Sequence, residues 1–299
     1  MRRTSALVVA AILLLAGCGA PPTDTPMVEA PTDVPSAPTP SETLPSPATE
    51  QPAATMGPTQ AVATLLPLSL QSDLETIRLR MLHSHQNWRS IWLELEVTEY
   101  PPEGSDLLVR YHRVQVWVRQ PAELLLLRGP ADGDPDYFSV SDGTHFLEAD
   151  LSTGATQEGE ITPYALEPFV APEAITDTIS GHPLEGMIRY PGGEMVFPTG
   201  LAQRQGTFEL IGEDAVAGRD ALIVDWAPQP TGLIADRFRI DALTGVLLRH
   251  QVLGKTGGGE RVESDLVVTH IVFDPEFPSG LFSVGLPETL HFAAPLDAE

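Results

Sequence analysis

Three consecutive stretches decide the fold: AGRDALIVDWAP (residues 217–228), DRFRIDALTGVLLRHQVL (236–253) and GKTGGGERVESDLVVTHIVF (254–273). They are rich in apolar and β-branched residues, and clusters of Gly, Pro, Asp and Thr separate the apolar runs. This pattern predicts β-strands joined by tight turns, as in an antiparallel meander. Gly245 lies where such a turn needs a left-handed backbone. No segment within these three stretches has the length or the period of a helix, so we expect a protein built on a β-sheet.

A second set of strands is expected upstream. Between residues 91 and 98 two rows of side chains alternate, and successive side chains of a strand point to opposite faces of the sheet. One row is Ile91, Leu93, Leu95 and Val97, and the other is Trp92, Glu94, Glu96 and Thr98. In a strand over 107–118, Val114, Val116 and Val118 share one face, whereas Gln115 and Trp117 share the other. Asp142-Gly143 predicts a hairpin turn between two short strands.

Residues 124–127 are four consecutive leucines, which makes this strand apolar on both faces. Such a strand is buried on both sides. Helices could cover one face and a ligand or a plug the other, or the protein itself could cover both. Trp92, Trp117, Leu125 and Leu127 are the candidate ligand-binding residues, with Trp92 and Trp117 at a cavity mouth. The alternative is that the two tryptophans are ordinary core aromatics.

The charge balance argues against nucleic-acid partners. The 299 residues include 17 Lys and Arg against 41 Asp and Glu, for a formal net charge of −24. A nucleic-acid surface needs a basic face, which this composition cannot easily supply.

The N-terminus predicts export and a lipid anchor. Arg2 and Arg3 precede an apolar run over 6–15 that is too short to span a bilayer stably. The following Leu15-Ala16-Gly17-Cys18 resembles a bacterial lipobox, in which the cysteine receives diacylglycerol and further acyl chains such as palmitate. The alternative is an ordinary secretory signal. Cys18 is the only cysteine, which leaves no disulfide framework, thiolate metal site or cysteine nucleophile.

These features predict three parts: a lipoprotein signal peptide (1–17), a tether (18–66) and a folded domain (67–299). The tether is dense in Pro, Thr, Ser and Ala and has no aromatic residue, so it cannot offset its ordering entropy. We expect the domain to be extracytoplasmic in the cell envelope, on the outer face of the cytoplasmic membrane or in the periplasm. It would be held to the membrane through acylated Cys18.

Two further segments complete the domain. Ser72-Asp-Leu-Glu75 has the form of a capping box, which predicts a helix over 72–86. Residues 155–205 contain many prolines and scattered acidic residues, and we interpret them as an insertion with short helices near 164–170 and 183–189, acting as a lid or a plug.

Catalytic motifs are not found. The sequence has no G-x-S-x-G, H-E-x-x-H or P-loop pattern, so we expect no enzyme, no cofactor and no metal site. His83 and His85 are expected to form a surface pair at a helix end. The pattern D-x-x-T-G occurs at Asp150–Gly154 and at Asp241–Gly245. A paired ligand loop is one interpretation, but turn chemistry is favoured because Asp accepts backbone amides and Gly supplies a positive φ.

The order of these features resembles a known superfamily. A helix and two long strands precede Val140-Ser-Asp-Gly143, His145–Asp150 and Thr153-Gly154, and Arg237–Asp241, Thr244-Gly245, Phe277-Pro278 and Leu281-Phe282 follow. Over about residues 72–287 this resembles the LolA and LolB lipoprotein carriers and the N-terminal domain of the RseB/MucB sigma-factor regulators. The resemblance implies a mainly β (α+β) fold: a curved antiparallel sheet, or incomplete β-barrel, closed by a few short helices. It also implies an apolar cavity for acyl chains.

Two functions are therefore expected. The first is a membrane-anchored lipoprotein whose LolA-like domain binds an acyl chain or a lipoprotein, in lipid handling or envelope sensing. The alternative is a non-enzymatic structural or interaction lipoprotein with a self-filled core and an envelope protein as partner.

Overall fold

The computed structural model describes residues 65–162, 167–176, 178–179, 181–229, 233–256 and 259–296. The expected signal peptide and almost all of the expected tether, including Cys18, lie outside the described residues.

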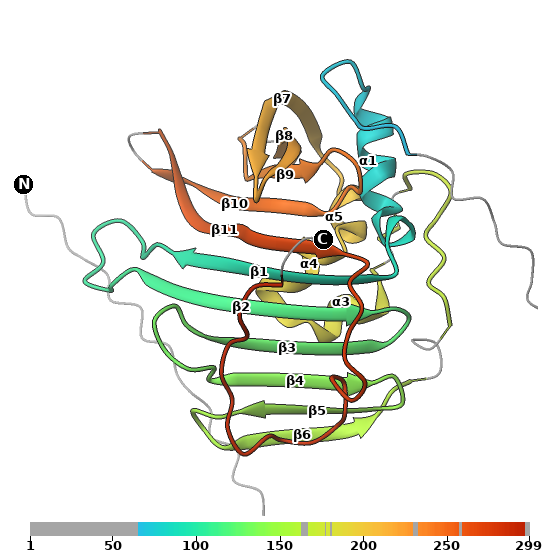
Figure 1. Cartoon of the computed structure of the whole chain (residues 1–299). Helices are drawn as coiled ribbons and strands as arrows, with labels where there is room; N and C mark the ends of the chain where they lie inside the picture. Colours follow the sequence, from blue (N-terminus) through green and yellow to red (C-terminus); the bar gives the residue numbers. More distant parts are fainter. Residues whose placement is uncertain are drawn as a thin grey trace, which may run out of the picture. The chain divides into compact units, whose positions relative to one another are not determined.

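An antiparallel sheet of eleven strands forms the framework (Figure 1). The strands of its first half are β1 (Ser90–Glu99), β2 (Arg110–Arg119), β3 (Glu123–Pro130), β4 (Tyr137–Asp142), β5 (His145–Asp150) and β6 (Ala155–Glu160). Those of its second half are β7 (Thr207–Val216), β8 (Arg219–Ala227), β9 (Asp236–Asp241), β10 (Leu247–Thr256) and β11 (Gly259–Phe273). Both predicted strand series are confirmed, although β2 begins at Arg110 rather than near residue 107.

Two meanders are joined edge to edge. The spatial order is β6-β5-β4-β3-β2-β1-β11-β10-β9-β8-β7, so strands adjacent in sequence pair within each half. The link between the halves is β1 with β11, where Ile91 pairs with Phe273 and Glu99 with Ser264. The sheet is curved and open, with β6 and β7 at its edges. The expected mainly β class and curved, incomplete sheet are confirmed; the sheet is open and does not form a closed barrel.

The helices are short. Those between β6 and β7 lie behind the strands in Figure 1, and the one that precedes β1 lies beside the sheet at the upper right. They are α1 (Leu74–Leu82), the 3₁₀ turn η1 (Ser84–Asn87), α3 (Pro183–Met187), α4 (Arg189–Val196) and α5 (Thr199–Ala202). The predicted helix over 72–86 is therefore shorter, and its predicted cap is wrong. Asp73, not Ser72, is the N-cap and accepts a 2.7 Å hydrogen bond from Thr76 N, whereas Ser72 Oγ accepts from Ser69 N.

The segment from 155 to 205 is not one irregular insertion. Residues 155–160 form strand β6, which pairs with β5. The short helix expected near 183–189 is confirmed as α3, and the one expected near 164–170 falls partly outside the described residues. Leu184, Ile188, Val196 and Phe197 are fully buried in the main core, so this segment covers the helix face of the sheet.

The two D-x-x-T-G segments are turns, as favoured from the sequence. Asp241 Oδ1 accepts from Thr244 N (2.7 Å) and Thr244 Oγ1 (2.8 Å), and Gly245 has φ +82°. Asp150 Oδ1 accepts from Ser152 N and Thr153 N in the same way, before Gly154 at φ +73°. In each turn the Oδ1 of the Asp is bonded within the turn, and Asp241 Oδ2 accepts from Arg219, which leaves the ligand-loop interpretation without support.

Candidate functional site

The structure brings the four candidate residues together on the face opposite the helices. Trp92 on β1 pairs with Trp117 on β2, Trp117 pairs with Leu125 on β3, and Leu125 pairs with Val140 on β4. Leu127 lies one step along the same face and pairs with Phe138. The two indole rings are 6.4 Å apart. We call the six residues Trp92, Trp117, Leu125, Leu127, Phe138 and Val140 the apolar strip.

The alternation in the sequence explains this arrangement. The other row of each strand, which includes Leu93, Val116, Leu124 and Leu126, packs in the main core on the helix face. The apolar strip belongs to a separate cluster. The prediction that the four leucines 124–127 are buried on both faces is thus confirmed, and a different layer covers each face.

The layer over the apolar strip is the C-terminal segment. We call residues 274–296 the C-terminal strap. It has no helix or strand over its described length and runs across the front of β1 to β6 (Figure 1). Its apolar side chains pack on the strip: Phe277, Leu281, Phe282, Leu290 and Phe292. Under the strap Trp92 is 0%, Trp117 5%, Leu125 9% and Leu127 5% exposed.

The strap is fastened to the sheet near its two ends. At the start, Asp274 Oδ1 accepts from Arg89 N (2.6 Å) and Ser90 N (3.2 Å), and Ser90 Oγ donates to Pro275 O. At the far end, Gln115 Nε2 donates to Ala293 O (2.8 Å), and Ala293 N donates to Gln115 Oε1 (2.8 Å). Between these ends the described hydrogen bonds are internal, from Leu281 N to Pro278 O and from Ser283 N to Gly280 O, apart from an exposed pair of His291 Nδ1 with Asp134 Oδ1 (2.8 Å) near the far end.

Two arginines lie over strap aromatics. The Arg119 guanidinium is 5.1 Å from the centre of the Phe282 ring, and that of Arg113 is 4.8 Å from the Phe292 ring. Such contacts contribute about 0.5–1 kcal/mol each at exposed positions. The middle of the strap is therefore held mainly by side-chain packing.

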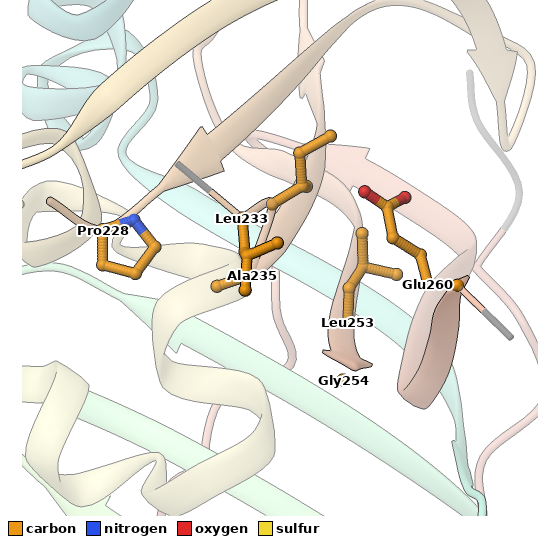
Figure 2. Close-up of a pocket in the computed structure, with 8 residues that line it drawn as sticks. Pro228, Leu233, Ala235, Leu253, Gly254 and Glu260 are labelled. Carbon is orange, nitrogen blue, oxygen red and sulfur yellow. The ribbon is translucent and has the colours of Figure 1, made fainter. Parts of the chain in front are cut away.

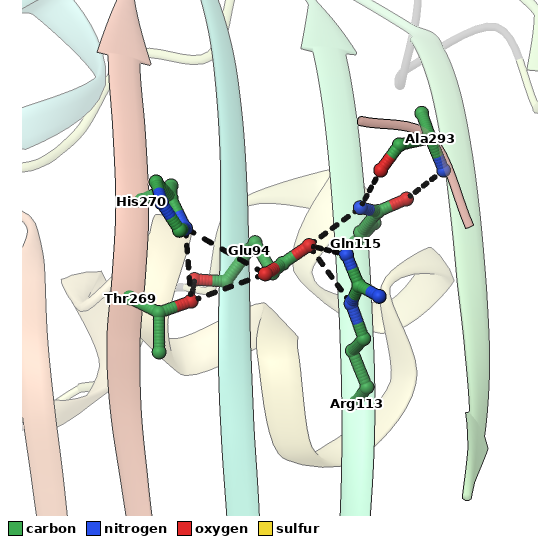
Figure 3. Close-up of polar contacts among 6 residues, drawn as sticks. All are labelled: Glu94, Arg113, Gln115, Thr269, His270 and Ala293. Atoms are coloured by element: carbon green, nitrogen blue, oxygen red, sulfur yellow. Dashed lines mark hydrogen bonds and ion pairs between the residues drawn. The ribbon is translucent and has the colours of Figure 1, made fainter. Parts of the chain in front are cut away.

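A polar network borders the apolar strip (Figure 3). Glu94 is 7% exposed and lies two residues after Trp92, on the same face of β1. Its Oε2 accepts from Arg113 Nε (2.9 Å), Arg113 Nη2 (2.5 Å) and Gln115 Nε2 (2.6 Å). Its Oε1 is 3.6 Å from His270 Nδ1. A buried charge requires such partners, and here they also orient the Gln115 amide that holds Ala293.

One polar atom inside the strip has no partner. The Trp92 indole Nε1 is buried, and no described group accepts a hydrogen bond from it. Buried indole N–H groups usually find an acceptor, and leaving one unpaired costs about 1–3 kcal/mol. A carbonyl or ester oxygen held at the strip would supply that acceptor.

A second buried group lies on the helix face. The His85 and His182 rings are 5.5 Å apart, and His182 stacks on Phe197 at 3.8 Å. Burial lowers the pKa of His85 to about 4 and, together with the nearby His85, that of His182 to about 3. The expectation of His83 and His85 as a surface pair is therefore wrong for His85, which is 4% exposed because the rings of Phe169 and His182 pack against it.

Glu185 adjoins this group. Burial, and secondly the charge of Glu194, raises the pKa of Glu185 to about 7. The Ser84 hydroxyl is buried and has no hydrogen-bond partner among the described residues. His182 Nδ1 accepts from Leu184 N and caps α3, which is a structural role. Sequence reasoning missed this group because His85 and His182 are 97 residues apart in the sequence.

A small pocket lies away from the strip (Figure 2). Its volume is about 330 Å³, and Leu233, Ala235 and Leu253 form part of a mostly apolar wall, with Glu260 at its margin. None of the four candidate residues lines it.

Among the described residues no helix combines the length and apolarity needed to cross a membrane. Within the same part of the chain, no group of three or more His, Cys, Asp or Glu side chains is arranged to hold a metal ion.

Comparisons with known proteins complete the description. No family model matches the sequence, and no curated protein is significantly similar to it. Among solved structures, the chain is similar to MucB in the MucA/MucB complex of Pseudomonas aeruginosa, with 16% identity and a TM-score of 0.42 over 72% of this chain and 62% of that one. It therefore spans less than two thirds of the MucB chain.

Two other similar structures span more of their own length. One is a LolA superfamily protein from Nitrosomonas europaea, with 11% identity and a TM-score of 0.30 over 71% of this chain and 98% of that one. The other is the Mycobacterium tuberculosis lipoprotein LppX, with 13% identity and a TM-score of 0.34 over 66% and 94%. The expected LolA-like and MucB-like resemblance is thus found, as a likeness of fold. At these identities and scores no functional step rests on it.

Proposed function

We propose that this protein is a membrane-anchored bacterial lipoprotein whose extracytoplasmic domain binds a hydrophobic ligand, an acyl chain or a lipoprotein, on the apolar strip. One observation carries the proposal. A continuous apolar surface with two tryptophans crosses four strands, and an irregular segment covers it instead of a helix or a second sheet. We propose a binding role in lipid handling or envelope sensing, without catalysis or a cofactor.

The strap gives the ligand a way in. It is held to the sheet by few polar contacts, near Asp274 and at Ala293, so part of it can lift when a ligand replaces the packing of its apolar side chains. When an apolar ligand replaces apolar side chains, a similar apolar area stays buried. The free-energy change is therefore small, because burial stabilises in proportion to the area removed from water. Four neighbouring strands at about 4.8 Å spacing span roughly 14 Å, a length along which an acyl chain could lie.

The alternative function is a structural or protein-interaction lipoprotein with a self-filled core. The observation in its favour is the near-complete burial of Trp92, Trp117, Leu125 and Leu127 under the protein's own strap. In that case the strap is a permanent second layer of the core, and an envelope protein binds elsewhere.

The test is native mass spectrometry of residues 67–299, purified from a lipid-containing host. The binding proposal expects a bound species of lipid mass, lost in Leu125→Asp and kept in Leu151→Asp, an exposed position on the turn after β5. Circular dichroism checks that both variants are folded. A mass free of ligand that persists after palmitate and acylated peptides are added would refute the binding proposal and leave the self-filled alternative.

The anchor is tested separately, because Cys18 lies outside the described residues. The proposal expects the full-length protein to fractionate with membranes and to incorporate labelled palmitate. Cys18→Ser should abolish the incorporation and release the protein. Equal labelling of parent and variant would exclude Cys18 as the modified residue.

A further inference from the structure

The strap shows what kind of chain the apolar strip can hold. Gln115 is 0% exposed, and both atoms of its side-chain amide pair with one residue of the strap: Nε2 donates to Ala293 O, and Oε1 accepts from Ala293 N, each at 2.8 Å. These are the two hydrogen bonds that a β-strand neighbour makes with a residue opposite it. Gln115 therefore recognises a peptide backbone and not a particular side chain.

The orientation of this amide is fixed in advance (Figure 3). Gln115 Nε2 also donates to Glu94 Oε2 at 2.6 Å, and Arg113 holds the same carboxylate oxygen. The amide nitrogen thus stays on the Glu94 side and the amide oxygen stays free to accept. The methylene chain of an acyl group has neither an N–H nor a C=O, so it would leave this buried amide partly unpaired if it lay here.

The strap residues before Ala293 define the neighbouring contacts. Leu290 and Phe292 are half-buried and pack against the strip cluster, whereas His291 between them is exposed and meets Asp134 at 2.8 Å. Side chains two residues apart on one side of the chain indicate a locally extended segment. Phe292 also lies under the Arg113 guanidinium, next to the Gln115 pairing.

We propose that the ligand of the apolar strip is an extended polypeptide segment, with bulky apolar side chains at alternate positions before a backbone group that pairs with Gln115, and that the strap is its internal mimic. This deepens the proposed function by naming a polypeptide and not a free acyl chain as the occupant. A lipoprotein or an envelope protein would bind here through such a segment by displacing residues 288–293.

The experiment uses the full chain with Cys18→Ser, so that anchoring does not interfere, and with Phe292→Ala to weaken the internal competitor. An intramolecular segment acts at an effective concentration of the order of millimolar, which would otherwise mask a peptide added in solution. The probe is a fluorescent peptide of sequence LPETLHFAAPL, identical to residues 286–296. A second peptide with Asp in place of Phe is the specificity control, and palmitate is the second ligand.

The proposal expects the first peptide to bind and the Asp peptide to bind at least tenfold more weakly. Gln115→Leu, which cannot pair with a backbone, should weaken the peptide about tenfold or more, since two hydrogen bonds are lost, and leave palmitate binding unchanged. Gln251→Leu is the matched control, because Gln251 on β10 is similarly buried but contacts Arg239 instead of the strap.

Each contrary result is distinct. Equal peptide affinity with and without Gln115→Leu would overturn backbone recognition. Binding of palmitate without the peptide would overturn the polypeptide inference and leave the proposed function standing. Binding of neither ligand, in chains that circular dichroism shows to be folded, would overturn both.

Discussion

Opening of the strap is testable by comparing two buried phenylalanines. Phe282 in the strap is 4% exposed and packs on the apolar strip, and Phe238 on β9 is 0% exposed and packs in the main core. Each side chain also contacts a second ring, Phe277 at 5.5 Å and His250 at 5.0 Å. Burial alone would therefore predict similar costs for Phe282→Ala and Phe238→Ala.

The proposed opening predicts different costs. Replacing a buried Phe with Ala lowers the free energy of unfolding by about 3–5 kcal/mol when that position stays buried in every folded form of the protein. Phe238→Ala should lower the free energy of global unfolding by about that amount, because β9 pairs with both β8 and β10. Phe282→Ala should lower it by less than about 2 kcal/mol, because the loss cannot exceed the free energy of docking the strap and the sheet stays folded when the strap leaves.

Hydrogen exchange and urea unfolding separate these effects. In Phe282→Ala the Ala293 amide should lose nearly all of its protection, a fall of up to about thirtyfold, because a docking free energy of about 2 kcal/mol sets this limit. Protection of the amides in β2 should fall less than about thirtyfold. If the Ala293 amide of Phe282→Ala stays as strongly protected as the β2 amides, the strap does not open separately, and the proposed route for the ligand fails.

Three further predictions concern the turns and the buried ionisable groups. Gly245→Ala should destabilise more than Gly154→Ala, by about 2 kcal/mol or more in urea unfolding: both have positive φ, but a Cβ at 245 would lie 2.3 Å from Arg80 O, whereas nothing lies within 4 Å at 154. Equal destabilisation by the two substitutions would show that the positive φ alone, and not the contact with Arg80 O, sets the cost. The folded-state pKa of Glu185, about 7, lies above its ordinary 4.5, so the folded state binds more protons between these values and stability falls as pH rises through them. Glu185→Gln should remove that decline, so its free energy of unfolding should rise relative to that of the parent between pH 4.5 and 8. If the unfolding free energies of variant and parent change with pH in the same way, the burial of the carboxyl is contradicted. For His182 the pKa is lowered to about 3, so stability should fall as pH drops below about 6.5, and His182→Asn, which can still cap α3, should flatten this acid limb. An unchanged acid limb in His182→Asn would exclude His182 as its source.

Local patterns were sufficient for much of the sheet. The alternation over residues 91–98 and 114–118 predicts which side chains share a face, because a strand turns successive side chains to opposite sides whatever its neighbours are. The Asp-Gly and D-x-x-T-G segments predict turns, because those side chains and a positive φ act within four residues. The helix cap was displaced by one residue, since Ser72 and Asp73 can both cap and only the surrounding contacts decided between them.

At the candidate site, local sequence patterns do not predict which segments come together. Composition and alternation by themselves determined a β-sheet protein with Trp92, Trp117, Leu125 and Leu127 as buried or ligand-facing residues. Only the tertiary structure decided that these four lie in register on one face, that residues 274–296 cover them, and that Gln115 pairs with Ala293 across 178 residues. It also decided that β1 joins β11 and that His85 is buried against His182. The physical reason is that turns and strand faces depend on neighbours along the chain, whereas covering a face depends on packing between segments far apart in sequence.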